Sequence, residues 1–182
     1  MQKPKQSSRR IFLKQLTGTT LAITTASLAS LAAQAKREEY ILQYQKDFSS
    51  NDQINVASIG MGIMGNNNAK AAIAVPGVKL VAACDLFTGR LERAKELHGK
   101  DLFVTNDYRK ILERKDIDAV IISTADLWHA RINKAALRAG KHVYCEKPMV
   151  HYIGEGLDVI KVQKESGKVM QVGSQYVSNI VF

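Results

Sequence analysis

Three glycines in the stretch IGMGIMGNNN could form a phosphate-binding turn. Gly60, Gly62 and Gly65 follow one another at G-x-G-x-x-G spacing. In such a turn the first glycine permits a tight bend, the second lets the backbone approach a pyrophosphate, and the third lets a helix pack closely on a strand. The free N–H groups at the start of that helix attract the phosphates. The predicted contact segment is Gly60, Met61, Gly62, Ile63, Met64 and Gly65.

A carboxylate lies where the other half of such a site would need one. Asp85 follows the apolar run VKLVAAC and stands 20 residues after Gly65. An acid at this distance can accept hydrogen bonds from an adenosine ribose, and its charge disfavours a 2′-phosphate. The sequence therefore predicts NAD as the cofactor. NADP is the less favoured alternative, because Arg90 could reach back toward a phosphate. A glycine turn without a ligand, with Asp85 as a solvated loop acid, is the other interpretation.

The elements that must position these residues alternate between short apolar runs and helical stretches. We expect strands over residues 54–59, 78–84, 103–104, 119–123, 142–145 and 169–172, and helices over 64–75, 88–97, 107–113, 127–139 and 154–166. Thr88 and Asp107 are expected to cap the second and third helices. The run AVIIS is apolar throughout, as in a strand covered on both faces. This alternation, with short connections, predicts an α/β fold with a doubly wound parallel sheet of the Rossmann type.

Composition and charge argue against several other classes of protein. The chain has 182 residues, of which 46% are hydrophobic and 24% charged, so it can bury a core. Its net charge of +9 divides into +5 for residues 1–35 and +4 for the remainder. No basic run interleaves with aromatic residues in that remainder, so nucleic-acid binding is not expected. Cys84 and Cys145 lack metal-ligand spacing and are expected to be buried thiols. The alternative is a disulfide between them in an oxidising compartment.

The first 35 residues have the three parts of an export signal. The segment SRRIFLK, residues 8–14, resembles the twin-arginine signal; 21 uncharged residues follow, and AQA at residues 33–35 predicts cleavage before Lys36. We expect the twin-arginine translocation machinery to export the folded protein to the periplasm or the medium. An uncleaved signal would leave it anchored in the membrane. Residues 36–52 are expected to form a polar linker before a nucleotide-binding domain over residues 53–182.

Two further segments make the interpretation more specific. They are AGKHVYCEKPM at residues 139–149 and DLWHA at residues 126–130. Together with GMGIMG and the Cys84-Asp85 pair, they resemble the Gfo/Idh/MocA family, which includes glucose–fructose oxidoreductase and inositol dehydrogenase. The resemblance covers residues 53–182, and its E-K-P motif follows the fifth expected strand.

The resemblance implies roles for matched positions. Lys147 would lie beside the nicotinamide and the substrate, where it would polarise or deprotonate a hydroxyl. Glu146 would contact the nicotinamide ribose, and Pro148 would shape the turn that presents the lysine. The other implied cofactor contacts are Ser123 and Thr124 after the fourth strand, and Trp128 and His129, which would cover the cofactor. The alternative is that Trp128 and His129 serve only to pack or cap the fold.

The chain departs from the family pattern in two ways. Members often have proline where this chain has Ala125, two residues after Ser123. The family also has a second α/β domain, which carries the substrate pocket, the usual catalytic histidine and much of the oligomer interface. This chain ends at Phe182. We therefore expect the nucleotide-binding part of a longer, homo-oligomeric protein, able by itself to bind nucleotide without turnover.

Three functions are compatible with these features. The first is hydride transfer between NAD and a hydroxyl-bearing carbon of a sugar or cyclitol. The second is an exported glycosidase or lyase that uses tightly bound NAD to oxidise, eliminate, hydrate and reduce. Exo-glycosidases of that kind tend to have valine at the position of Lys147, which argues against that subgroup. The third is a non-catalytic nucleotide-binding remnant.

Overall fold

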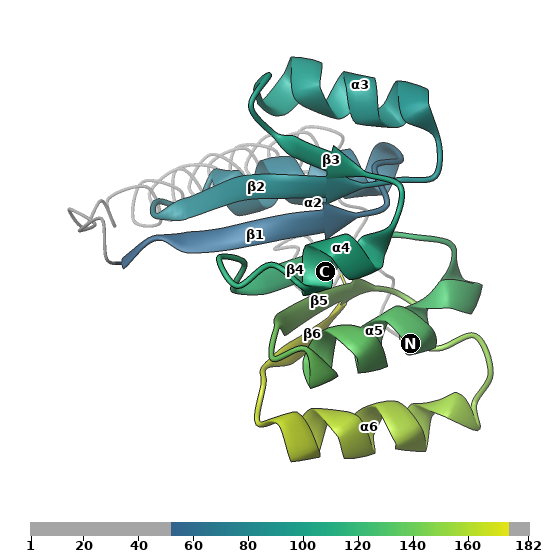
Figure 1. The fold of residues 1–182 in the computed structure, drawn as a ribbon. Coiled ribbons are helices and arrows are strands. Elements are labelled where there is room, and N and C mark those ends of the chain that lie inside the picture. Colours follow the sequence, from purple (N-terminus) through teal and green to yellow (C-terminus); the bar gives the residue numbers. More distant parts are fainter. Residues whose placement is uncertain (1–51, 175–182) are drawn as a thin grey trace, which may run out of the picture. The chain divides into compact units, whose positions relative to one another are not determined.

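The computed structural model describes residues 52–174 (Figure 1). The predicted export signal, its cleavage site and most of the predicted linker lie outside these residues, as does the end of the chain from residue 175. Within residues 52–174 no helix is both long enough and apolar enough to cross a bilayer.

A six-stranded parallel sheet forms the centre of the described domain. Its strands lie in the order β3-β2-β1-β4-β5-β6, and every neighbouring pair is parallel. Their bounds are Ile54–Ile59 for β1, Val78–Cys84 for β2, Phe103–Thr105 for β3, Ala119–Ile122 for β4, His142–Glu146 for β5 and Met170–Gly173 for β6. The strand order reverses between β1 and β4, and ligands of such sheets bind at that point. The predicted doubly wound fold is confirmed.

Helices cover both faces of the sheet. Their bounds are Ile63–Ile73 for α2, Thr88–His98 for α3, Tyr108–Leu112 for α4, His129–Arg138 for α5 and Glu155–Ser166 for α6, with a short 3-10 turn η2 at Asp126–Trp128. Figure 1 shows α4 and α5 in front of the sheet and α2 behind it. One core cluster joins β1, β4 and β5 to α4, α5 and α6, and a second joins β1 and β2 to α2 and α3.

The alternation of side chains along β1 explains this two-layered core. Ala57 and Ile59 pack in the layer of α5, whereas Val56 packs in the layer of α2. A strand at the centre of a parallel sheet buries both faces, so its sequence reads as a continuous apolar run. The apolar runs predicted the central strands well, because β1 is buried from Val56 to Ile59 and β4 from Val120 to Ile122.

The helix ends differ from the sequence prediction in instructive ways. Asp107 caps α4 as predicted, since its Oδ1 accepts a hydrogen bond from the backbone N–H of Arg109 at 3.0 Å. The predicted cap at Thr88 is wrong. The extended N-cap residue is Phe87, whose own N–H is bound by the Asp85 carboxylate at 3.0 Å, and Thr88 is the first helical residue.

The two cysteines are buried and separate. Cys84 ends β2 and Cys145 lies in β5, with β1 and β4 between them. Three strand spacings amount to roughly 14 Å, beyond the ~7 Å reach of a disulfide. Burial raises the pKa of Cys84 to about 12 and that of Cys145 to about 11. Both side chains are therefore core thiols, as predicted, and the disulfide alternative is wrong.

Candidate functional site

Two glycines of the turn are required by the fold itself. Gly60 has a φ of +95°, and a Cβ there would lie 2.5 Å from the carbonyl oxygen of Ser123. A Cβ on Gly65 would overlap the carbonyl oxygen of Gly60. These two positions bring the end of β1, the start of α2 and the end of β4 into direct backbone contact. Neither glycine therefore needs a ligand to explain it.

Gly62 has no such internal reason to be glycine. Its φ of −71° and ψ of −165° suit any residue. A Cβ at this position would meet nothing nearer than the Arg90 guanidinium, 3.8 Å away. Gly62 is the N-cap of α2, which has no side-chain cap and no acid in its first turn. The first N–H groups of a helix have no acceptor within that helix. Open space above uncapped N–H groups fits a phosphate group.

Asn66 holds this turn from the inside. Its Nδ2 donates to the carbonyl oxygen of Met61 at 2.9 Å and to that of Gly62 at 3.0 Å. Both carbonyls are therefore engaged by the protein. The sequence analysis missed this residue, because the run NNN does not reveal which of its side chains points inward.

Asp85 is part of the same turn. Its side chain is almost fully buried, and its Oδ2 accepts a hydrogen bond from the N–H of Met61 at 2.8 Å. Its Oδ1 accepts from the N–H of Phe87, and Arg90 Nη1 lies 3.4 Å from Oδ2. A carboxylate offers about four acceptor positions, so one remains for a ribose hydroxyl. The acid is thus a structural brace, and the ribose contact stays a prediction.

Arg90 lies at the rim of the turn. Its side chain is 51% exposed, and its guanidinium lies 4.9 Å from the centre of the Phe87 ring. It therefore sits between the Asp85 carboxylate and the open space beside Gly62. This position suits either neutralisation of Asp85 or contact with an additional phosphate.

A cavity of about 440 Å³ adjoins the turn at the carboxyl ends of β4 and β5. Its walls bring together six of the predicted site residues with one that was not predicted, Asp126. The lining residues are Met64, Ser123, Thr124, Asp126, His129, Glu146 and Lys147. Residues from three separate parts of the sequence therefore meet where the strand order reverses.

Asn68 connects the two halves of this site. From α2, its Nδ2 donates to Glu146 Oε1 at 2.7 Å and to Ser123 Oγ at 3.1 Å. The second oxygen of Glu146 lies 3.3 Å from the backbone N–H of Lys147. Glu146 is almost fully buried, so its carboxylate orientation is fixed by these neighbours. Asn68 is a second residue that the sequence analysis missed.

Lys147 and its neighbours differ sharply in exposure. Lys147 is exposed at the mouth of the cavity, before a cis bond to Pro148. His129 is buried, with Nδ1 2.6 Å from the carbonyl oxygen of Pro148 and Nε2 3.1 Å from that of Thr124. Trp128 is 38% exposed, and the Arg131 guanidinium lies 5.5 Å from its ring centre. Trp128 does not line the cavity, so its predicted contact with the cofactor stays a prediction, whereas His129 lines the cavity beside the loops of Thr124 and Pro148.

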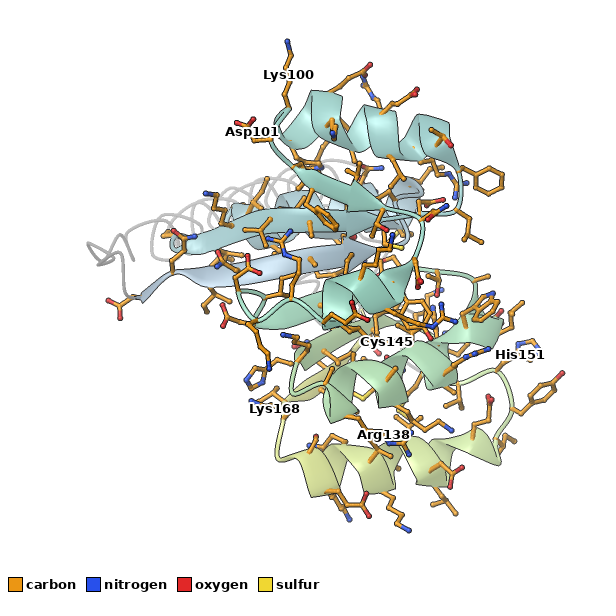
Figure 2. The ribbon with its side chains drawn as sticks, viewed as in Figure 1. Lys100, Asp101, Arg138, Cys145, His151 and Lys168 are labelled. Atoms are coloured by element: carbon orange, nitrogen blue, oxygen red, sulfur yellow. The ribbon has the colours of Figure 1, made fainter. Side chains whose placement is uncertain are left out.

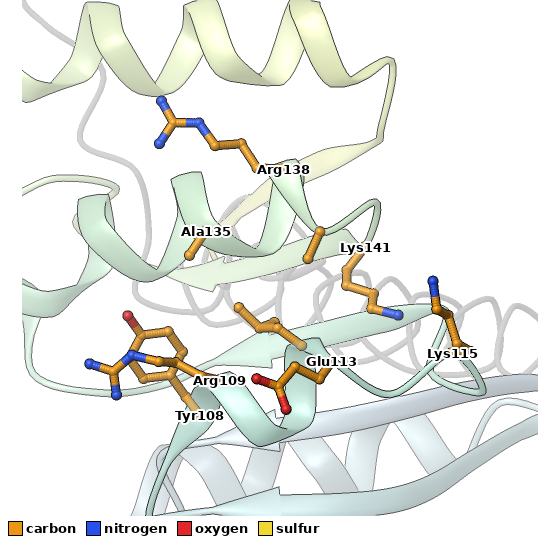
Figure 3. A pocket seen from close by; sticks show the side chains of 9 residues that line it. Tyr108, Arg109, Glu113, Lys115, Ala135, Arg138 and Lys141 are labelled. Carbon is orange, nitrogen blue, oxygen red and sulfur yellow. The ribbon is translucent and has the colours of Figure 1, made fainter.

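A larger cavity lies elsewhere, between α4 and α5 (Figure 3). Its volume is about 730 Å³, but its chemistry is explained by the fold. Lys141 Nζ donates to the carbonyl oxygens of Arg114 and Ile117, in the segment between α4 and β4. The charged ends of Arg109, Lys115 and Arg138 point in different directions (Figure 3). Because its cations do not converge, we place the functional site in the smaller cavity beside the glycine turn.

The glycine turn and the adjoining cavity together can bind an anion and can donate or accept a proton. The turn offers backbone donors for a pyrophosphate, and the cavity offers a primary amine and a buried carboxylate beside it. No cluster of three or more potential metal ligands occurs within residues 52–174. A nucleotide lying across the carboxyl ends of β1 and β4 would bring its far end to Glu146 and Lys147.

Comparison with known proteins agrees with this geometry. The family model Gfo/Idh/MocA, described as an oxidoreductase family with an NAD-binding Rossmann fold, matches residues 54–174. Inositol 2-dehydrogenase of Salmonella typhimurium is 35% identical over 117 residues, which are 63% of this chain and 35% of that protein. A glycosyl hydrolase family 109 protein of Shewanella baltica is 32% identical over 173 aligned positions, and the alignment covers 88% of this chain and 38% of that protein.

Solved structures give the same result. The myo-inositol 2-dehydrogenase of Lactobacillus plantarum is 30% identical with a TM-score of 0.66, over 70% of this chain and 38% of that one. A 3-ketoreductase of Actinomadura kijaniata, solved with TDP-benzene and NADP, is 28% identical with a TM-score of 0.64, over 70% of this chain and 39% of that one. The chain thus spans 35–38% of the length of the curated relatives it matches.

Proposed function

Because the chain belongs to the Gfo/Idh/MocA oxidoreductase family, we propose that its described domain binds NAD across the carboxyl ends of β1 and β4. The observation that carries this proposal is Gly62. Its backbone angles suit any residue and its side-chain position is open, so neither strain nor packing requires glycine there, whereas a closely approaching pyrophosphate would. The uncapped start of α2 would hold the pyrophosphate, and Asp85 would accept from the adenosine ribose.

We further propose hydride transfer involving a hydroxyl-bearing carbon of a sugar or cyclitol in the whole protein. NAD, when bound, supplies the hydride acceptor. Glu146, held by Asn68 at 2.7 Å, would accept from the nicotinamide ribose. Lys147, exposed in the same cavity, would donate to the substrate hydroxyl oxygen as an ammonium, or take its proton as an amine. The matching inositol 2-dehydrogenases support a polyhydroxylated substrate.

NAD is proposed over NADP on electrostatic grounds. The buried Asp85 carboxylate would face a 2′-phosphate at close range, and like charges repel strongly where water is excluded. Arg90 is already engaged with Asp85 at 3.4 Å, which reduces what it can offer a phosphate. The NADP bound to the related 3-ketoreductase makes this selectivity worth measuring directly.

A second candidate function is bond cleavage assisted by NAD. It is favoured by the glycosyl hydrolase family 109 relative, whose match extends over 88% of this chain. In that case NAD is recycled within each turnover. Incubation with sugars and cyclitols would then yield no NADH, whereas an aryl glycoside would release its phenol without an added acceptor. Net hydride transfer gives the opposite pair of results.

Export by the twin-arginine machinery to the periplasm or medium is also proposed, with membrane anchoring if the signal is not cleaved. The support is the segment SRRIFLK followed by an uncharged stretch. Replacing Arg9 and Arg10 together with lysine should retain the protein in the cytoplasm. Sequencing of the exported protein should show Lys36 as the first residue.

Calorimetric titration of the chain with NAD tests the central part of this proposal. Saturable binding, weaker for NADP, is expected. A folded chain that binds neither nucleotide would contradict it.

A further inference from the structure

Three polar side chains beside the cavity, Asp126 in η2 and His129 and Asn133 in α5, contact the chain beyond β5. Positions 126, 129 and 133 are three and four residues apart, a spacing that places side chains on one side of a helix. We call these residues the α5 seam. Their contacts are Asp126 Oδ2 to His151 Nδ1 at 3.0 Å, His129 Nδ1 to the Pro148 carbonyl oxygen at 2.6 Å, and Asn133 Nδ2 to the Met149 carbonyl oxygen at 3.3 Å.

Two members of the seam are deeply buried. His129 is 2% exposed and Asn133 is 0% exposed. Burying a polar side chain opposes folding unless hydrogen bonds replace its contacts with water. Asn133 Oδ1 has no hydrogen-bond partner among the described residues, so asparagine is not the best choice for packing alone. Both residues direct donors at the turn, and Asn133 Nδ2 also donates to Cys145 Sγ in β5 at 3.3 Å.

The side chains of His129 and Asn133 bind two consecutive backbone carbonyls. Pro148 and Met149 directly follow Lys147, and both of their carbonyl oxygens are held from α5. Carbonyl oxygens only accept, so the short contact requires a proton on His129 Nδ1. The other ring nitrogen lies 3.1 Å from the carbonyl oxygen of Thr124, in the loop after β4. A neutral ring donates through one nitrogen only, so with the proton on Nδ1 it binds the Pro148 carbonyl, while Nε2 only lies beside the loop after β4.

We propose that His129 and Asn133 are positioning residues, which fix the turn that carries Lys147 and so set where its amine stands. The importance of that placement for turnover rests on the proposed function. The geometric claim does not, because it concerns the protein without nucleotide. His129 is thereby assigned to the support of Lys147 and not to direct contact with the substrate.

The third contact of the seam serves as a control. The side chains of His151 and Asp126 are 38% and 43% exposed, and exposed ion pairs contribute little to stability. Figure 2 shows His151 at the surface, beyond the buried Cys145. Replacing His151 with glutamine should therefore leave the turn in place.

The experiment uses the full chain labelled with ¹³C in its methionine methyl groups. Met149 lies in the turn itself, and the buried Met61 lies in the glycine turn as an internal reference. The variants are His129→Gln, His129→Asn and Asn133→Leu, beside His151→Gln. An asparagine amide can occupy the place of Nδ1, whereas a glutamine amide reaches toward that of Nε2. His129→Asn should therefore rescue the contact with Pro148 that His129→Gln loses.

We expect His129→Gln and Asn133→Leu to shift or broaden the Met149 methyl signal and to leave that of Met61 unchanged. His129→Asn and His151→Gln should retain the wild-type Met149 signal. Long-range ¹H–¹⁵N spectra of the wild-type chain should show the proton on His129 Nδ1. An unprotonated Nδ1, or a wild-type Met149 signal in His129→Gln, would overturn the proposal.

A second measurement separates this proposal from the proposed function. ADP-ribose lacks the nicotinamide, the part of NAD that would lie beside Lys147, so its dissociation constant should change less than about threefold in every variant. A wild-type chain that binds no ADP-ribose refutes the nucleotide site, while the methyl spectra still decide the role of the seam. A loss of ADP-ribose binding in His129→Gln alone would show that the seam acts on the whole fold, and would overturn its assignment to Lys147.

Discussion

The carboxylate of Asp85 accepts a hydrogen bond from the backbone N–H of Met61 at 2.8 Å, across 24 residues of sequence. This bond joins the end of β2 to the middle of the glycine turn. The same oxygen lies 3.4 Å from Arg90 Nη1. The acid at this position therefore shapes the turn as well as facing the place proposed for a ribose.

Replacing Asp85 with asparagine should lower stability without any nucleotide present. A single amide oxygen cannot accept from both Met61 and Phe87, so a buried N–H loses its partner. The expected loss is about 1–3 kcal/mol in the free energy of unfolding. Urea unfolding measures it, with the exposed Asp101→Asn as the matched control. An unchanged unfolding free energy would mean that Asp85 serves the ligand only.

Replacing Asp85 with serine should also change nucleotide selectivity. Removal of the carboxylate releases Arg90 and ends the repulsion of a 2′-phosphate. The ratio of NADP to NAD affinity should rise by about tenfold, which corresponds to about 1.4 kcal/mol. Titration with both nucleotides measures the ratio. The additional change Arg90→Ala should reverse the gain, and a gain that persists would exclude Arg90 as its source.

Replacing Lys147 with methionine should separate binding from turnover. The exposed amine makes no contact with the glycine turn, so the NAD dissociation constant should stay within about threefold. Turnover of a sugar or cyclitol by the whole protein should fall by about 10²-fold or more, since a positioned acid–base group contributes that much. The exposed Lys79→Met is the control. Equal turnover in both variants would refute the proposed role.

His98 should make stability depend on pH. Burial, followed by the nearby charge of Lys70, lowers its pKa from the usual 6.5. The unfolded chain then binds this proton more readily than the folded one, so stability is full above pH 6.5 and falls as the pH drops below it. The fall ends below the folded pKa, where both states are protonated.

The variant His98→Leu tests this dependence. Neither ring nitrogen has a hydrogen-bond partner among the described residues, so leucine removes a titration without breaking a bond. Urea unfolding at pH 7 and pH 5 should show a smaller difference for the variant than for the wild type. An identical difference would show that other groups cause the dependence.

The sequence predicted the sheet and the glycine turn because both depend on local patterns. Six apolar runs mark six strands, and Gly60 and Gly65 stand where backbones touch. The supporting amides were not predictable in this way. Asn66, Asn68 and Asn133 all look like ordinary polar helix residues. Asn68 and Asn133 derive their roles from partners that only the fold brings near, whereas Asn66 binds carbonyls of its own turn, which the run NNN does not reveal. The cap at Thr88 failed for a related reason, since the distant Asp85 fixes the N–H of Phe87.

The most direct test of the nucleotide site is a calorimetric titration of the chain with NAD, compared with Gly62→Asp. Aspartate suits the N-cap position of a helix, so the variant should fold at least as stably as the wild type. Its carboxylate would occupy the place proposed for the pyrophosphate, and NAD affinity should fall by about 100-fold or more. Wild-type affinity in a folded Gly62→Asp chain would contradict the account, because the open face of the turn would then not be where the nucleotide binds.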